Sequence, residues 1–156
     1  MKLCNDSITV FNARINARIG GTTWIGTNIS GVSWWATDAS TVDASKGGLV
    51  AANKATIRIP ADADAGRKSY TDPISYKAAD DVTNLWTLQD GDIIVKGAIP
   101  TETEEQHATP DGDITVYVPI EYTAAQLKRS YESVVVLGVT DNRRAPNAPH
   151  FKVVAT

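Results

Sequence analysis

Residues 132–156 read Glu132-Ser-Val-Val-Val-Leu-Gly-Val-Thr-Asp-Asn-Arg-Arg-Ala-Pro-Asn-Ala-Pro-His-Phe-Lys-Val-Val-Ala-Thr156, and this stretch decides the fold class. Two β-prone runs, residues 134–140 and 150–155, flank a loop rich in Arg, Pro and Asn. This pattern predicts two paired β-strands joined by an exposed loop. Residues 134–139 are apolar on both faces. We therefore expect a central strand that is covered on both sides.

Val, Ile and Thr recur in short blocks along the rest of the chain, and Gly, Asn, Asp and Pro separate the blocks. Such punctuation is typical of a β-protein. In residues 54–60, Ile57 and Ile59 face one way, and Pro60 ends the pairing because it has no N–H to donate. Further strands are expected at residues 7–16, 73–76, 92–97 and 114–120.

Residues 23–37 leave two arrangements open. The segments 24–28 and 32–36 could pair as a hairpin around residues 29–31, or the whole region could form one long bent strand.

One helix is predicted near residues 123–132, because Thr123-Ala-Ala-Gln126 fits a capping box. Residues 77–84 also allow a helical turn. Residues 61–72 and 101–112 are polar and are expected to be long loops.

The resulting fold class is all-β and mainly antiparallel, a small barrel or sandwich with long loops and one short helix. Residues 1–156 form a single domain, with a loop insertion around residues 101–120.

Composition narrows the class of protein. The 156 residues carry a formal net charge of -3, which argues against a dedicated nucleic-acid-binding domain. Cys4 is the single cysteine, so an internal disulfide is impossible. The first residues lack the apolar region of a signal peptide, and no apolar run approaches the ~20 residues of a membrane helix. We expect a protein made in the cytoplasm, with no membrane partner.

The sequence contains no recognisable catalytic or metal-binding pattern. His107 and His150 lack ligand spacing, and no Ser/His/Asp arrangement stands out. The two Asp-Gly-Asp segments at residues 90–92 and 111–113 lack the further ligands of a calcium loop and are read as turns. The prediction is a protein that is not an enzyme and uses no cofactor and no metal.

Seven residues are candidates for contact with another protein chain. Aromatic residues and arginine are enriched at interfaces, and an acidic loop can become ordered against a partner. The candidates are Trp34, Trp35, Arg143, Arg144, Glu102, Glu104 and Glu105.

Each group of candidates has an alternative interpretation. Adjacent strand residues point to opposite faces, so one of Trp34 and Trp35 is expected in the core and the other at the surface, where a lone indole can also hold a sugar. Arg143 and Arg144 could form an inter-subunit salt bridge or contact a phosphate. Alternatively they form a solvated loop tip, or one of the two pairs locally with Asp141.

Three parts of the chain, in this order, resemble a family of small proteins from tailed phages and prophages of Firmicutes. The family lies in the structural gene cluster between the major capsid and the tail tube. The resemblance covers nearly the whole chain, and the last part is the most specific. No property is carried over to residues 101–120. The parts are Ile8-Thr-Val-Phe-Asn-Ala-Arg14 with Gly31-Val-Ser-Trp-Trp35; Ala55-Thr-Ile-Arg-Ile-Pro-Ala-Asp-Ala-Asp64 with Tyr70-Thr-Asp-Pro73 and Leu88-Gln-Asp-Gly-Asp-Ile-Ile-Val-Lys-Gly97; and Leu137-Gly-Val-Thr-Asp-Asn-Arg-Arg-Ala-Pro-Asn-Ala-Pro-His-Phe-Lys-Val-Val154.

The resemblance implies a structural virion protein of the head–tail connector, or neck, of the stopper or head-closure type. Such proteins are small β-barrels that assemble into rings. The implied partners are copies of the chain in a 6- or 12-fold ring, the portal or adaptor above, and the tail terminator or tail tube below. Double-stranded DNA passes without sequence recognition, and the family offers no catalytic residue. As a further expectation, one of the loops at residues 61–72 and 101–112 faces the channel.

Two alternatives stay open. Within the virion, the chain could be a tail-completion protein or a capsid decoration protein. In another class, it could be a carbohydrate-binding β-sandwich module that uses exposed tryptophans.

Overall fold

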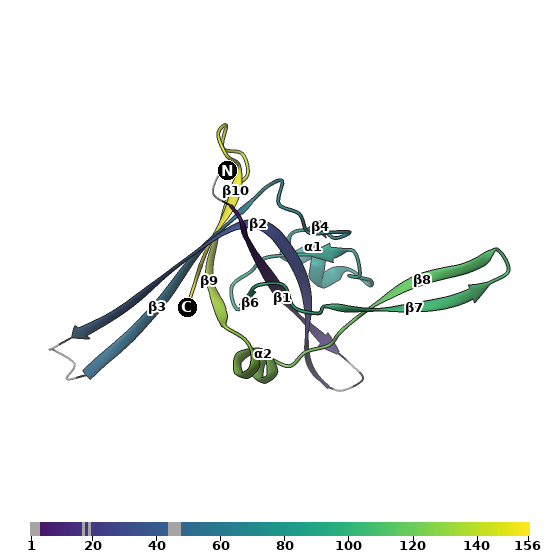
Figure 1. Cartoon of the computed structure of the whole chain (residues 1–156), viewed down its shortest axis with the longest axis horizontal. Coiled ribbons are helices and arrows are strands. Elements are labelled where there is room, and N and C mark those ends of the chain that lie inside the picture. Colours follow the sequence, from purple (N-terminus) through teal and green to yellow (C-terminus); the bar gives the residue numbers. More distant parts are fainter. Residues whose placement is uncertain (1–3, 17, 19, 44–47) are drawn as a thin grey trace.

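The computed structural model of the chain describes residues 4–16, 18, 20–43 and 48–156 (Figure 1). It is mostly antiparallel β-structure with two short helices, which confirms the all-β prediction. The strands are β1 Asp6–Asn16, β2 Gly21–Asp43, β3 Gly48–Pro60, β4 Ser69–Tyr70, β5 Leu85–Trp86, β6 Ile93–Lys96, β7 Glu102–Thr109, β8 Gly112–Pro119, β9 Ser133–Asn142 and β10 His150–Ala155. The helices are α1 Pro73–Ala78 and α2 Ala124–Ser130.

Six strands close into a barrel in the order β1-β2-β3-β10-β9-β6, with antiparallel pairing at every step. Closure gives each of the six strands a partner strand on either side over part of its length. The predicted pairing of the last two strands is present, since β10 pairs with β9 on one side and with β3 on the other.

Strand β2 is one long bent strand, so the second of the two arrangements is the observed one. It pairs with β1 as far as Val32 and with β3 from Ser33 onward, and Gly31 at the change of partner has a φ of 80°. Beyond the Ala36–Ala55 pair, β2 and β3 pair only with each other. This part leaves the barrel as a free strand pair, at the left of Figure 1.

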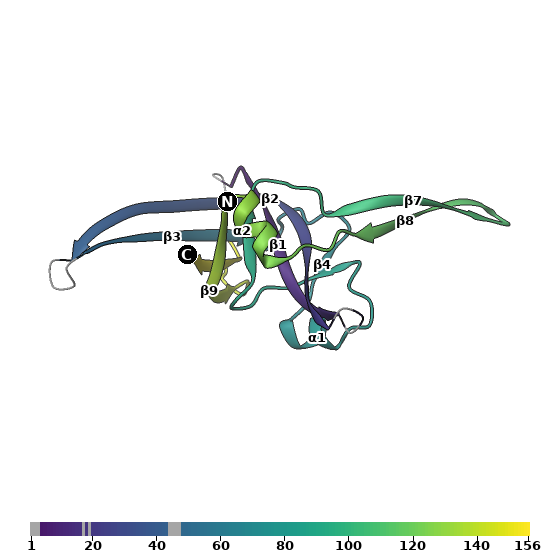
Figure 2. The ribbon, with the colours of Figure 1, turned by 90° about the horizontal axis from the view of Figure 1, so that it is seen from below.

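The prediction that residues 101–112 lack structure is wrong. They form β7 and a turn, and β7 pairs with β8 from Glu102–Pro119 to Thr109–Gly112. The polar composition hid the strand, whereas the alternating apolar column of β8 and the Asp111-Gly112 turn, with a φ of 118° at the glycine, favour a hairpin. We call residues 102–119 the acidic ribbon. It projects away from the barrel on the side opposite to the β2–β3 pair (Figures 1 and 2).

The hydrophobic core lies on both sides of β1 and β6. Ile8 and Ile94 face the barrel interior, while Phe11, Ile93 and Leu127 pack between the wall and α2. The strands covered on both faces are therefore β1 and β6.

The expectation of full cover for β9 is wrong. Leu137 is 53% exposed, because the register shifts between Val154 and Ala155 and leaves Leu137 as an extra residue on β9. Such a bulge turns a side chain away from the regular alternation.

The capping box of α2 is confirmed. The Gln126 N–H donates to Thr123 Oγ1 at 3.2 Å, and the Thr123 N–H donates to Gln126 Oε1 at 2.9 Å. Leu127 then lies fully buried against the barrel wall.

The prediction of a short strand at residues 73–76 is wrong, because this segment belongs to α1. The Asp72 side chain accepts a hydrogen bond from the Ser75 N–H, and Pro73 occupies the first turn, where a missing N–H costs nothing.

Replacing Thr123 by alanine should remove the cap hydroxyl and lower the free energy of unfolding by about 1 kcal/mol. Urea unfolding followed by circular dichroism measures this change. Thr123→Ser keeps the hydroxyl and should stay close to the parent chain. Equal stability of all three proteins would show that the cap does not hold α2.

Candidate functional site

The two adjacent tryptophans lie on opposite faces of β2. Trp34 packs against the barrel core, and its ring lies 5.9 Å from Lys96 Nζ. Trp35 points outward and is 67% exposed. Of the two indoles, that of Trp35 is the more exposed, and its role at an interface stays a prediction.

The Arg143 side chain binds residues of its own chain. Its Nε and Nη2 donate to the two carboxylate oxygens of Asp141 at 2.9 and 2.8 Å, and its guanidinium lies 4.7 Å from the ring centres of Tyr70 and Phe151. These hydrogen bonds lower the pKa of Asp141 to about 2. The local pairing with Asp141 is therefore the observed one, whereas Arg144 is exposed beside it.

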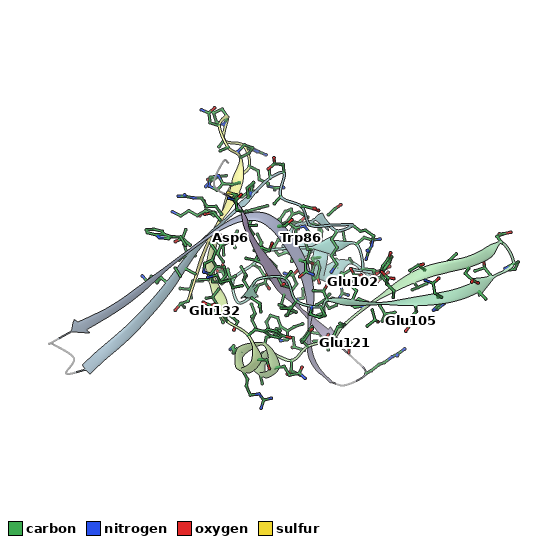
Figure 3. All side chains as sticks on the ribbon, viewed as in Figure 1. Asp6, Trp86, Glu102, Glu105, Glu121 and Glu132 are labelled. Atoms are coloured by element: carbon green, nitrogen blue, oxygen red, sulfur yellow. The ribbon has the colours of Figure 1, made fainter. Side chains whose placement is uncertain are left out.

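The three glutamates follow the acidic ribbon outward from the barrel. Glu102 lies at its base, where Arg67 Nη2 donates to both carboxylate oxygens at 2.7 and 2.6 Å. Arg67 also stacks 3.5 Å from the ring centre of Tyr117. Glu104 and Glu105 are exposed farther out, and Figure 3 shows Glu105 beyond Glu102 along the ribbon.

An open pocket of about 530 Å³ lies between residues 60–66 and the aromatic residues beside them. Tyr70, Trp86 and Phe151 contact one another, with ring centres 4.6 to 6.2 Å apart, and Arg143 lies at the mouth. The pocket joins segments that are distant in the sequence, so no local pattern could have indicated it. It has room for a small polar group, and its lining includes Asp62, Asp64 and Lys68.

Asp92 is buried inside the barrel end. Its Oδ2 accepts hydrogen bonds from Asn12 Nδ2 and from the Gln89 N–H, both at 2.9 Å. Burial raises the pKa of this carboxyl to about 7. The turn expected at residues 90–92 is present, with a φ of 90° at Gly91. The described residues contain no group of His, Cys, Asp or Glu suited to a metal ion.

Lys68 is the other buried charge that sequence reasoning missed. Its Nζ donates to the Gly26 carbonyl at 2.8 Å and to Thr27 Oγ1 at 3.1 Å. Burial lowers the pKa of Lys68 to about 8, although the nearby Glu102 partly opposes this shift. Lys68 and Arg67 thus bring two cations to the base of the acidic ribbon.

Replacing Arg67 by alanine should loosen the acidic ribbon without unfolding the barrel. The salt bridge is partly exposed, so the expected loss of global stability is below about 1 kcal/mol. Hydrogen exchange should nevertheless become faster in residues 101–120, since the stacking on Tyr117 is lost too.

Arg144→Ala is the matched control, because it removes an exposed arginine far from the ribbon base in the sequence. Ribbon amides that exchange equally in Arg67→Ala and Arg144→Ala would show that Arg67 does not anchor the ribbon.

Comparison with known proteins places the chain in a family. A model described as a family of unknown function (DUF6751) matches residues 3–156, so the chain belongs to that family. No curated protein and no solved structure matches the chain. Among the described residues, no helix is long and apolar enough to cross a membrane.

Proposed function

We propose that this member of the DUF6751 family is a structural virion protein of a tailed bacteriophage. In this proposal it forms part of the head–tail connector, a neck or stopper ring that joins the portal to the tail and lets DNA pass. The resemblance of the barrel strands and the last hairpin to phage neck proteins supports this role. A non-enzymatic function follows from the proposal.

The observation that carries the proposal is the pair of projections on a closed barrel. The β2–β3 pair and the acidic ribbon leave the barrel on opposite sides (Figure 2). A two-stranded ribbon is marginally stable alone in water, so ribbons of this length gain stability by packing on a neighbour. A closed barrel presents such projections and its outer faces as contact surfaces. This design suits a subunit that touches a copy on each side.

The charge of the chain is compatible with DNA passage. A net charge of -3 gives a DNA backbone little to bind, since affinity for phosphates depends on Lys and Arg. We propose that one of the segments 61–72 and 101–112 faces the channel and repels the passing duplex.

The alternatives differ in how well the described surface suits them. A tail-completion or capsid decoration protein would use the same projections and belongs to the same class. A carbohydrate-binding module would need sugar platforms, and Trp34 turns inward, which leaves Trp35 as the exposed indole of the pair. Quenching of tryptophan fluorescence by a sugar, in a chain that stays monomeric, would favour that module.

The test is removal of the chain from a phage that encodes it. A connector subunit is required to close the filled head and attach the tail, so electron microscopy should show heads separated from tails. A tagged chain should be found at the neck of complete virions. Normal, infectious tailed particles assembled without the chain would overturn the proposal.

A further inference from the structure

One face of the acidic ribbon carries a partly exposed row of aliphatic side chains on β8. Directly paired residues of an antiparallel pair share a face. The pairs Thr103–Val118, Glu105–Val116 and His107–Ile114 therefore place three aliphatic side chains in a row. Ile114 is 50% exposed. The opposite face carries Glu102 and Tyr117, which Arg67 ties to the barrel, so the aliphatic row is the face left for a partner.

The ribbon is also strongly negative. Its 18 residues contain no Lys or Arg and five acids, namely Glu102, Glu104, Glu105, Asp111 and Asp113. Glu102 is paired with Arg67, and Glu105 lies 3.2 Å from His107. A partner for this ribbon must offer both an apolar row and positive charge.

The outer face of β2, β3, β10 and β9 carries the apolar side chains of Trp35 and Val154 in one cross-strand row. Pairing places Trp35 opposite Thr56, Thr56 opposite Val154, and Val154 opposite Gly138. The bulged Leu137 lies next to this row. Trp35 and Leu137 are 67% and 53% exposed, so this patch offers two large apolar side chains to a partner.

The same face carries three cations. Arg58 and Lys152 lie directly opposite each other, and Lys54 shares their face four residues before Arg58. Neither Arg58 nor Lys152 takes part in the ion pairs of the described residues. Like charges directly opposite in a sheet destabilise it. An anionic partner would relieve this repulsion.

We propose that the acidic ribbon of one copy packs its aliphatic row across the Trp35 face of the next copy. The carboxylate of Glu105, on the same face as the aliphatic row, then lies over Arg58 and Lys152. An eight-residue strand spans about 26 Å, which exceeds the ~14 Å across four paired strands. The inference names the contact inside the proposed ring, and it rests on that function only for the ring's place in a virion.

The two surfaces lie on opposite sides of the molecule, as the ribbon and the β2–β3 pair do in Figures 1 and 2. Each copy can therefore bind one neighbour through its acidic ribbon and another neighbour through its Trp35 face. A contact between two different patches is heterologous, and it builds a closed ring when the rotation between copies closes.

The test is a charge swap measured by sedimentation of the full chain over a range of concentrations. The ribbon variant Glu105→Lys and the face variant Arg58→Glu/Lys152→Glu should each associate at least about tenfold more weakly than the parent chain. An equimolar mixture should regain association, because the positive ribbon of one variant fits the negative face of the other. Salt should weaken association of the parent chain.

Matched controls separate the interface from general charge and general exposure. Lys128→Glu/Arg129→Glu makes the same change of charge as the face variant, but on α2, and should associate as the parent does. Ile114→Asn should weaken association, whereas Ile74→Asn, at an even more exposed isoleucine on α1, should not. Thermal melting of each variant confirms that the barrel is folded.

Three results would overturn the inference: a parent chain that stays monomeric at its highest soluble concentration, swapped variants that associate normally, or a mixture that does not recover. Binding of a short DNA duplex through Arg58 and Lys152, without self-association, would assign the face to nucleic acid instead. If the swap behaves as expected but the chain is absent from virions, the contact stands and the proposed function fails. If the chain lies at the neck but the swap fails, only the contact is wrong.

Discussion

Asp92→Asn is expected to raise the free energy of unfolding, and the gain should grow as the pH rises from about 4 to about 7. The carboxyl is buried, and burial raises its pKa from 3.8 to about 7 in the folded chain. The folded state therefore holds a proton that the unfolded chain releases near pH 4. Stability from this group is greatest below the unfolded pKa and is lost as the pH rises through the folded pKa.

The size of the expected change in stability follows from the shift in the pKa of Asp92. A rise in the pKa of Asp92 from 3.8 to about 7 corresponds to a change of about 4 kcal/mol in the free energy of unfolding between these two pH values. Asparagine carries no charge, and its amide oxygen can accept the hydrogen bonds that Asn12 and Gln89 now donate. The difference between variant and parent, measured by urea unfolding at each pH, removes the contribution of every other titrating group.

Asp81→Asn is a control of opposite sign. Asp81 is exposed, and hydrogen bonds from the hydroxyl and N–H of Thr83 lower its pKa. Its contribution is present above the unfolded pKa and is lost as the pH falls through the folded pKa, so this variant should lose its difference from the parent in acid. A stability difference for Asp92→Asn that stays constant with pH would contradict the buried, protonated carboxyl.

Local patterns predicted those parts of the fold whose partners lie nearby in the sequence. The Thr123 capping box and the last two strands are of this kind, because a cap spans four residues and a hairpin brings neighbouring segments together. The bend of β2 at Gly31 could only be offered as an alternative, since it depends on two different partner strands. The acidic ribbon was missed because its strand β7 carries hardly any apolar residue of its own.

The candidate surfaces show the same limit. Strand alternation correctly predicted that Trp34 and Trp35 would diverge. The aromatic stack around Arg143 joins residues from β4, β5 and β10, and the bond from Arg67 to Glu102 spans 35 residues. The burial of Asp92 likewise comes from Asn12, which lies 80 residues away. Such contacts exist only once the barrel has closed, so no spacing rule could indicate them.

Phe11→Ala is expected to lower the free energy of unfolding by about 3–5 kcal/mol, as large-to-small changes at fully buried aromatic residues do. The Phe11 ring is fully buried between β1 and the segment around α2. It makes an edge contact with Tyr122 at 5.3 Å between ring centres. Urea unfolding measures the loss, and Ile15→Ala, at an exposed position of the same strand, should change stability by less than about 0.5 kcal/mol.

A second substitution tests whether the ring itself is responsible. Gly26 lies opposite Phe11 on β2, and a Cβ at that glycine would come within 2.7 Å of the ring. Gly26→Ala should therefore destabilise the parent chain by about 1–3 kcal/mol. In the Phe11→Ala background the same change should cost clearly less, because the added methyl group then occupies vacated space. If the losses in the double variant are additive, the Phe11 ring is not what excludes a side chain at position 26. The clash would then be with the Thr101 methyl group, which lies 2.9 Å from the same Cβ position.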